Sequence, residues 1–493
     1  MSDNLNFIVI PLDDRPVTYS LPLEISSINS NINVFLPPRE YLGNLEKYAD
    51  VEKILEWLKV TTENNKIDYI ICSLDTLVYG GLIPSRRMDT PLNHLINDVE
   101  KIKSILYESK QKSNSKIYAF SSIMRISNNN INEEEKLYWD EYGEFIYQYS
   151  YFTHKYEATE QENDLNELEA VSILIPEPII EDYIKTRERN FDINKKYLNF
   201  ITENIVDYLV YSLDDTGQFG FNVKESKYFE NYVKNNLLEE KVSIKTGADE
   251  IALSLFSKAI TKESNEVISI HPVYSTEKGK SIISKYEDKT IENSVKGQIE
   301  LAGCHYTDNA ANMIILVHTP SECQNDHAMR VYCDKSNNNS VEFCLNTIKN
   351  TEKPIILIDI SHANGGDSEL VKELINQNLL HKLYSYSGWN TTGNTLGSAI
   401  FTAVNRYISE TNNTYNDTNF KKCLLVRLAD DWAYQAIVRQ EIRDLTEMAD
   451  IELLKEKLLP YINLLAKSIN LNNNSTELTF PWKRTFEVEI NVK

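Results

Sequence analysis

The sequence predicts an α/β fold, a TIM barrel of the (β/α)8 type with a helical insertion and a C-terminal, mainly helical cap. Short apolar runs without alternation recur along the 493 residues, which indicates strands covered on both faces of a parallel sheet. Helical stretches lie between the runs and supply the crossover connections. The rhythm of eight to ten such units favours the barrel. A doubly wound open sheet, split into two halves, is the alternative.

The elements follow in chain order. We expect strands at 7–12, 33–37, 69–74, 116–123, 208–213, 241–244, 266–270, 312–317, 354–358 and 382–387. We expect crossover helices at 50–59, 92–109 and 368–377, and a helix at 251–260 after the strand at 241–244. Residues 128–205 read as an acidic, Tyr-rich helical insertion, and residues 406–493 as the helical cap, closing with a strand at 485–490. The expected domains are therefore a catalytic barrel at 1–405 with that insertion, and a cap at 406–493.

Composition and charge restrict the partners. The chain has 51 Lys and Arg against 73 Asp and Glu, a formal net charge of −22, which argues against sequence-independent nucleic-acid binding and against docking on anionic lipid. No secretory signal is apparent, and the longest apolar runs are too short to span a bilayer. We expect a cytoplasmic protein with a small-molecule or oligosaccharide substrate, no nucleic-acid or membrane partner and no cofactor. The sequence leaves open whether the protein forms a homo-oligomer.

The cysteines and tyrosines allow two weaker inferences. The six cysteines include no Cys-x-x-Cys pair, so we expect free thiols. The 29 tyrosines reflect either codon bias, since Asn, Ile and Lys are also abundant, or an aromatic lining for a polar ligand such as a sugar.

A pair of adjacent carboxylates, Asp214 and Asp215, ends the strand at 208–213 and is followed by a glycine-containing loop. Two carboxylates in a dry site repel each other, so the pKa of one rises, as a general acid requires. A turn or a helix cap is the structural interpretation, because Asp favours both. We predict the catalytic pair here.

Further polar residues end the early strands. Asp13, Asp14 and Arg15 follow the first strand, where they can bind sugar hydroxyls, although Arg15 can instead simply neutralise the pair. Asp75 lies beside a glycine-rich loop. Arg125 follows the fourth strand, where an unpaired buried charge would be costly, so a carboxylate partner is implied.

Later strands end in similar clusters. Asp249 and Glu250 precede a helix, where acidic residues are favourable regardless of function. The last two strands end in segments rich in Gly and Asn, a composition that indicates special backbone angles and close approach to a ligand. Trp389 can stack on a sugar or belong to the core. The candidate substrate-binding residues in these segments are Asp359, Asn364, Asp367, Trp389, Asn390 and Asn394.

A metal centre is the rival interpretation. Its candidate ligands are Asp13, Asp75, Asp359, Asp367, His305, His318 and His362. No His-x-His or His-Glu-x-x-His spacing occurs, so we predict no metal ligand. No Gly-x-Ser-x-Gly elbow is present either.

The motifs resemble a bacterial family known only as domain of unknown function 4127. They are Pro11-Leu-Asp-Asp-Arg-Pro16, Ser73-Leu-Asp-Thr-Leu-Val-Tyr-Gly-Gly81, Gly247-Ala-Asp-Glu250, Gly388-Trp-Asn-Thr-Thr-Gly-Asn-Thr-Leu-Gly397 and Ala429-Asp-Asp-Trp432. This resemblance covers nearly the whole chain and implies no established activity.

A weaker similarity is to the substrate-assisted N-acetylhexosaminidase barrels of glycoside hydrolase family 84. Asp214-Asp215 matches their Asp pair by type and chain order, and Asp359 to Asp367 is similar to their late acidic cluster, while the surrounding motifs differ. The resemblance implies that Asp214 orients the substrate acetamide and that Asp215 is the general acid/base. Without substrate assistance, Asp215 would need a second carboxylate, such as Glu250 or Asp14.

We therefore predict a glycoside hydrolase acting on N-acetylhexosamine-containing substrates. A metal-dependent hydrolase or isomerase of a small polar molecule is the first alternative. A non-catalytic carbohydrate-binding protein is the second.

Overall fold

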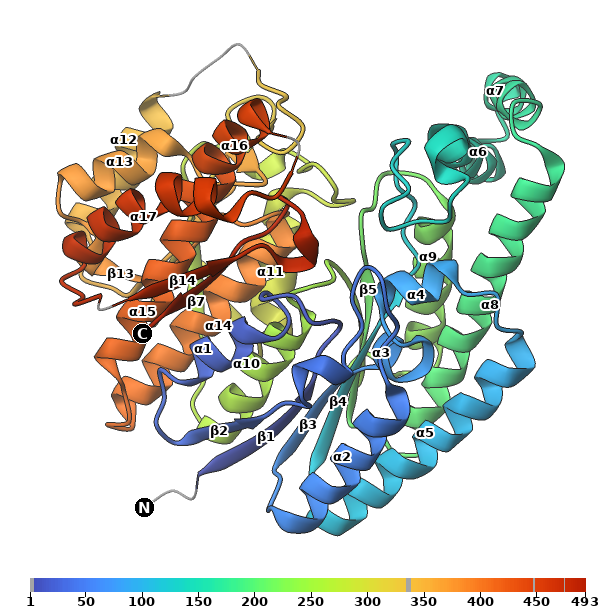
Figure 1. Ribbon diagram of the computed structural model, residues 1–493, viewed down its shortest axis with the longest axis horizontal. Helices are drawn as coiled ribbons and strands as arrows, with labels where there is room; N and C mark the ends of the chain where they lie inside the picture. The colour runs from blue at the N-terminus through green and yellow to red at the C-terminus, as the bar shows by residue number, and fades with distance from the viewer. Residues whose placement is uncertain (1–3, 334–337, 447, 474) are drawn as a thin grey trace. The chain divides into compact units, whose positions relative to one another are not determined.

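The computed structural model describes residues 4–333, 338–446, 448–473 and 475–493. The chain folds into two compact units (Figure 1). The N-terminal unit contains Leu5–Asp14 and Val34–Ala252, and the C-terminal unit contains Arg15–Asn33 and Leu253–Lys493. The chain thus passes from one unit to the other after Asp14, after Asn33 and after Ala252.

The N-terminal unit is built on a six-stranded sheet with the order β2-β1-β3-β4-β5-β6. Its pairs from β1 to β6 are parallel. The strands are β1 (Leu5–Ile10), β2 (Ile32–Phe35), β3 (Tyr69–Ser73), β4 (Lys116–Ile123), β5 (Tyr208–Leu213) and β6 (Val242–Thr246). All residues of β3 and β5 are buried, as expected for strands covered on both faces.

Helices connect these strands as crossovers. They are α2 (Val51–Asn64), α3 (Leu74–Tyr79), α4 (Leu82–Arg87), α5 (Leu92–Ser113) and α9 (Phe221–Asn235), with a short 3-10 turn at Arg39–Tyr41. Helix α3 starts directly after β3, where the Ser73 side chain accepts a hydrogen bond from the Thr76 amide, and it ends at Gly80 with φ +81°. This tight connection fixes Asp75 at the carboxyl end of β3.

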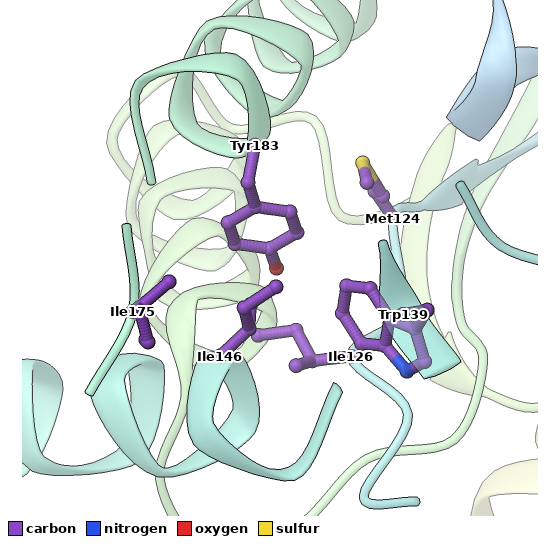
Figure 2. Packing of buried hydrophobic residues seen from close by; sticks show 6 residues of the cluster. All are labelled: Met124, Ile126, Trp139, Ile146, Ile175 and Tyr183. Atoms are coloured by element: carbon purple, nitrogen blue, oxygen red, sulfur yellow. The ribbon is translucent and has the colours of Figure 1, made fainter. Parts of the chain in front are cut away.

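The helical insertion contains α6 (Trp139–Thr159), α7 (Glu162–Ser172) and α8 (Glu177–Thr202), which confirms the helical character expected for 128–205. Figure 2 shows its apolar core, in which Trp139 and Ile146 of α6 meet Tyr183 of α8. Met124 and Ile126, which follow β4, complete this core together with Ile175. The insertion is therefore anchored to the segment that leaves β4, where the polar residues of the site begin.

The C-terminal unit has a second parallel sheet, with the order β13-β11-β9-β7-β8. Its strands are β7 (Ser269–Tyr274), β8 (His305–Tyr306), β9 (Met313–His318), β11 (Ile355–Asp359) and β13 (Leu383–Ser387). A short parallel ladder joins β10 (Asn325–Asp326) to β12 (His362–Ala363) beside this sheet. Numbered in chain order, the sheet reads 2-1-3-4-5, and the first five strands of the other sheet read the same. This is a doubly wound order.

The remaining elements pack within the C-terminal unit. The helices are α1 (Ser20–Ser26), α10 (Ile251–Ser264), α11 (Ile291–Leu301), α12 (Asn338–Asn350), α13 (Ser368–Asn376), α14 (Thr392–Thr411), α15 (Asp417–Arg427), α16 (Arg439–Leu445) and α17 (Ile451–Ser468). Short 3-10 turns lie at Gly279–Ser281, Leu380–Lys382 and Pro481–Lys483. An 11-residue π-helix, Leu428–Val438, connects α15 to α16. The chain closes with the antiparallel pair β14 (Thr476–Thr479) and β15 (Glu489–Val492), slightly later than the strand expected at 485–490.

The mixed α/β class with parallel sheets is confirmed. Among the described strands, the order in each sheet is that of the doubly wound alternative, and a closed eight-stranded barrel is not shown. The sequence favoured a closed barrel because both folds share the same strand–helix rhythm and differ only in which strands pair.

Two of the six cysteines form a disulfide. The structure joins Cys323 to Cys333 in a disulfide, so the expectation that all six cysteines are free thiols is wrong for these two. Their proximity depends on the path of the loop after β9, which the spacing of the cysteines in the sequence does not reveal.

In the described part of the chain, no helix combines the length and apolar character that crossing a bilayer requires.

Candidate functional site

Six charged side chains gather where β3, β4 and β5 of the N-terminal unit end. Arg86 comes from α4, Arg125 follows β4, Glu134 and Glu135 lie between β4 and α6, and Asp214 and Asp215 follow β5. We call these six residues the Asp–Arg cluster. Neighbouring parallel strands end at the same edge of a sheet, which is why segments far apart in sequence meet here.

Arg125 is the hub of the cluster. Its Nε lies 2.9 Å from Glu135 Oε1, its Nη2 lies 3.0 Å from Glu134 Oε2, and its Nη1 lies 3.0 Å from Asp215 Oδ2. The same Nη1 is 3.8 Å from Asp214 Oδ2. The carboxylate partner implied by the sequence is thus confirmed, and there are several.

Arg86 is the second cation, and its side chain is only 1% exposed. Its Nη2 donates to Asp214 Oδ2 at 2.6 Å, and its Nη1 lies 3.5 Å from Glu135 Oε1. Two guanidinium groups therefore face four carboxyl groups in a largely buried setting. The excess of carboxyl groups favours protonation of one of them.

Asp215 is the carboxyl group on which that protonation falls. Burial and the neighbouring Asp214 raise the pKa of Asp215 to about 7, although Arg125 opposes the shift. Its side chain is 28% exposed, against 16% for Asp214. Its backbone has φ +37°, a left-handed conformation that Asp tolerates better than most residues. The cluster thus offers a proton donor that is partly open to solvent, beside an ion-paired carboxylate.

The loop that carries the pair is fixed by α6. The Gly220 amide donates to His154 Nδ1 at 3.1 Å, and the Phe221 amide donates to Ser150 Oγ at 2.8 Å. Gly220, not an aspartate, is the N-cap residue of α9. The structural interpretation of the Asp pair as a helix cap is therefore wrong.

Asp75 lies at the carboxyl end of β3 and is 2% exposed. Its Oδ2 accepts a hydrogen bond from the Ser122 amide of β4 at 2.8 Å. Burial raises the pKa of Asp75 to about 7, and the hydrogen bond from Ser122 only partly offsets this. The charge of Arg86, a member of the Asp–Arg cluster, also opposes this rise. The hydrogen bond from Ser122 ties the carboxyl end of β3 to β4.

The other expected residues of this unit have separate environments. Asp13 is buried after β1. The Asp14 carbonyl accepts two hydrogen bonds from Arg39, at 2.9 and 2.7 Å. Asp249 and Glu250 precede α10 as expected, and Glu250 Oε2 accepts from the Ala248 amide at 3.1 Å.

The carboxyl edge of the C-terminal sheet has its own cluster, which we call the His–Asp cluster. It consists of His318 at the end of β9, Asp359 at the end of β11, Asp367 at the start of α13 and Tyr386 of β13. His318 Nε2 lies 3.0 Å from Asp367 Oδ2. Asp359 Oδ2 accepts from the Asp367 amide at 2.8 Å and from the Tyr386 hydroxyl at 3.1 Å.

The two carboxyl groups of this cluster have opposite pKa shifts. Burial raises the pKa of Asp359 to about 7, although His318 opposes the shift. Burial would also raise the pKa of Asp367, but the hydrogen bond from His318 outweighs it and holds this pKa well below its usual range. For His318, burial lowers the pKa, and the bond to Asp367 more than compensates, so the pKa lies well above its ordinary value.

The other expected substrate-binding residues of the C-terminal unit have structural surroundings of their own. Asn364 and Asn390 both have positive φ, near +59°, and the Asn364 amide donates to the Asn390 carbonyl at 2.8 Å. Trp389 is 4% exposed, so its ring belongs to the core and is not a stacking surface. Asn394 lies in the first turn of α14. Arg15 pairs with Glu487, with Nη1 and Oε1 3.1 Å apart.

Asp431 of the π-helix binds residues that adjoin the His–Asp cluster in the chain. Asp431 Oδ2 accepts from Ser387 Oγ at 2.8 Å and from the Gly388 amide at 2.9 Å, and its carbonyl accepts from the Gly366 amide. Sequence reasoning missed Glu134, Glu135 and Tyr386, and it did not pair Arg86 with Asp214. It grouped His318 with Asp359 and Asp367, but as candidate metal ligands. The run of acidic residues after Arg125 was the available signal for the two glutamates.

Metal binding finds no support in the described residues. No group of three or more His, Cys, Asp or Glu side chains among them has an arrangement that could hold a metal ion. His318, a metal candidate from the sequence, is instead engaged by Asp367 and Ser340.

Fold and site together define an α/β protein with two parallel-sheet units, each with an acid–base cluster at the carboxyl edge of its sheet. Residues 7–491 match the model of the family described as "Protein of unknown function (DUF4127)", so the chain belongs to this family. Comparisons with curated proteins and with solved structures gave no match. None of the comparisons shows a similarity to glycoside hydrolase family 84.

Proposed function

We propose that the protein is a glycoside hydrolase whose general acid is Asp215. One observation supports this most directly: Asp215, with a pKa of about 7, lies next to Asp214, which is ion-paired to Arg86. Neighbouring titratable groups with divergent environments are how glycosidases assign a proton donor and a charged partner.

In the proposed reaction, Asp215 gives its proton to the glycosidic oxygen while the bond from that oxygen to the anomeric carbon breaks. The leaving group departs as an alcohol. Water then adds its oxygen to the anomeric carbon, and the ionised Asp215 recovers a proton from that water. The cycle consumes one water and returns Asp215 to its protonated form.

The finer proposal concerns the substrate. By analogy with the hexosaminidases, the acetamido oxygen of an N-acetylhexosamine attacks the anomeric carbon as the bond to the leaving oxygen breaks, and Asp214 orients the acetamide N–H. The water of the second step then displaces the acetamido oxygen from the anomeric carbon and restores the acetamide. Arg86 and Arg125 support this assignment because they fix the orientation of Asp214. The closed barrel of those enzymes is part of the same analogy, but the proposed chemistry needs only the carboxyl edge of the N-terminal sheet.

The test is hydrolysis of 4-nitrophenyl glycosides, comparing N-acetylhexosaminides with glucosides and galactosides. Wild type is measured with and without EDTA, beside Asp214→Asn, Asp215→Asn and the exposed control Asp98→Asn. We expect turnover confined to acetamido sugars, a loss of about 100-fold or more in both cluster variants, and no effect of EDTA or of Asp98→Asn.

The pH profile adds a second readout. Asp215 donates only while protonated, so kcat/KM falls as pH rises through about 7. A 2,4-dinitrophenyl leaving group needs little protonation, so Asp215→Asn should lose much less activity on that substrate than Asp214→Asn. Equal losses on both leaving groups would contradict the acid role of Asp215. Sugar binding without turnover would favour a carbohydrate-binding protein, and EDTA-sensitive turnover would favour a metal enzyme.

A further inference from the structure

The residues next to Asp215 have unused hydrogen-bonding capacity. Thr216 is 8% exposed, and its Oγ1 is buried with no hydrogen-bond partner among the described residues. Within the same described part, the Nε of Arg86 is also buried without a hydrogen-bond partner. Buried polar atoms are nearly always paired with protein or with a bound molecule. Thr216 Oγ1, which belongs to the residue after Asp215, is therefore a group whose hydrogen bonding a polar ligand can complete.

Half-buried aromatic rings flank the same loop. Tyr147 and Tyr151 are one helical turn apart on α6, with ring centroids 6.3 Å apart and planes inclined by 29°. Phe219, from the loop after Asp215, meets the Tyr151 ring edge-on, with centroids 5.4 Å apart. The three side chains are only partly buried. Aromatic faces beside hydrogen-bonding groups are suited to sugar rings, which have apolar faces and hydroxyl edges.

Gly217 leaves room between the loop and α6. A Cβ atom at this position would have one neighbour within 4 Å, the Tyr147 hydroxyl at 3.7 Å. That distance is ordinary van der Waals contact, and no backbone atom beyond the chain neighbours of Gly217 lies within 4 Å of the Cβ position among the described residues. The open position and the aromatic rings thus belong to the same short segment that follows the acid.

We propose that Thr216, Gly217, Phe219, Tyr147 and Tyr151 form a subsite for a second sugar ring, on the leaving-group side of the bond that is cut. The side follows from the proposed function, on which this assignment rests: Asp215 protonates the leaving oxygen, and the subsite begins one residue further along the chain. The substrate is then at least a disaccharide, with an apolar ring face against the tyrosines and a hydroxyl on Thr216.

The test is binding of N-acetylglucosamine and its β-1,4-linked dimer and tetramer, by calorimetry, to the Asp215→Asn protein. We expect the dimer to bind about tenfold more tightly than the monosaccharide, as one added aromatic contact predicts. Tyr151→Ala and Gly217→Leu, each added to Asp215→Asn, should abolish this gain, the first by removing a ring and the second by filling the space. Tyr107→Ala, which changes an exposed tyrosine on α5, is the matched control and should keep it.

The kinetic arm uses proteins with Asp215 intact. Tyr151→Ala and Gly217→Leu should lower kcat/KM for the tetramer about tenfold. The control Tyr107→Ala should leave hydrolysis of both the tetramer and the 4-nitrophenyl monosaccharide within twofold of wild type. Equal affinity for monosaccharide and dimer, no sugar binding at all, or a gain that survives both variants would overturn the subsite. Aryl-glycoside turnover without length dependence would overturn the subsite alone. If the dimer binds more tightly than the monosaccharide, Tyr151→Ala removes this gain, and no substrate is hydrolysed, the subsite is supported as a binding site and the hydrolase function is rejected.

Discussion

The Asp–Arg cluster and the His–Asp cluster differ in their cations. Both lie at the carboxyl ends of strands in sheets that share the 2-1-3-4-5 order, and both contain an Asp whose pKa is raised to about 7. In the N-terminal unit the opposing charges are guanidinium groups, which stay charged at all ordinary pH values. In the C-terminal unit the opposing charge is His318, which titrates. The strand order thus determines where acidic side chains come together, while the choice of cation determines how each cluster responds to pH.

The largest predicted effect is loss of the hub arginine. Arg125→Met leaves four carboxyl groups with Arg86 as their only remaining cluster cation, so we expect unfolding of the N-terminal unit to become easier by about 3–5 kcal/mol. Arg125→Lys should recover part of this, because it keeps the charge but loses the multiple contacts. Amide hydrogen exchange of β4 and β5 measures the change locally.

The matched control for this prediction is Lys101→Met. It removes a cation from an exposed pair with Glu52 and should change little, since exposed pairs contribute about 0–1 kcal/mol. Similar exchange rates in wild type and Arg125→Met would show that the cluster is not held together by Arg125.

The second-largest predicted effect concerns the ion pair of His318 with Asp367. We expect Asp367→Asn to destabilise the C-terminal unit by about 2–3 kcal/mol at pH 7, because it removes the partner that keeps the buried His318 charged and so abolishes the ion pair. The Asp367 contribution is present above its unfolded pKa of about 4 and is lost as pH falls through its lowered folded value. The His318 contribution is complete below about pH 6.5 and is lost as pH rises through its raised folded value.

Hydrogen exchange of β9 and β11 from pH 4 to pH 10 therefore distinguishes the clusters. The deficit of Asp367→Asn should shrink at the alkaline end, where His318 is neutral in wild type as well. The deficit of Arg125→Met should not shrink there. A deficit of Asp367→Asn that is constant across this range would contradict the titrating role of His318.

The smallest effect concerns the buried acid Asp75. Its folded pKa of about 7 exceeds its unfolded value of about 4, so wild type loses stability as pH rises between these values. Asp75→Asn keeps an acceptor for the Ser122 amide and removes the ionisation, so we expect a gain of about 1–2 kcal/mol at pH 8 and none at pH 4. Urea unfolding at both values measures this, with Asp98→Asn as control; a gain equal at both values would point to packing instead.

Part of the site could be predicted from local sequence. Asp214, Asp215 and Arg125 were identified because polar residues that directly follow buried apolar runs must lie at strand ends. Glu134 and Glu135 were missed because they reach Arg125 through the irregular segment after β4, whose path depends on how Trp139 and Tyr183 pack. For Trp389 the sequence left a stacking role and a core role open, and tertiary packing buries the ring.

The sequence by itself determined the parallel strands, the helical insertion and the catalytic-pair hypothesis at Asp214-Asp215. Continuous apolar runs and helix periodicity are local properties, and a local pattern carries them completely. Only the tertiary structure decided the strand order of each sheet, the Cys323–Cys333 pair and the partners of each charge. These depend on which distant segments become neighbours, and that choice is made by burial of the whole unit rather than by any single stretch of chain.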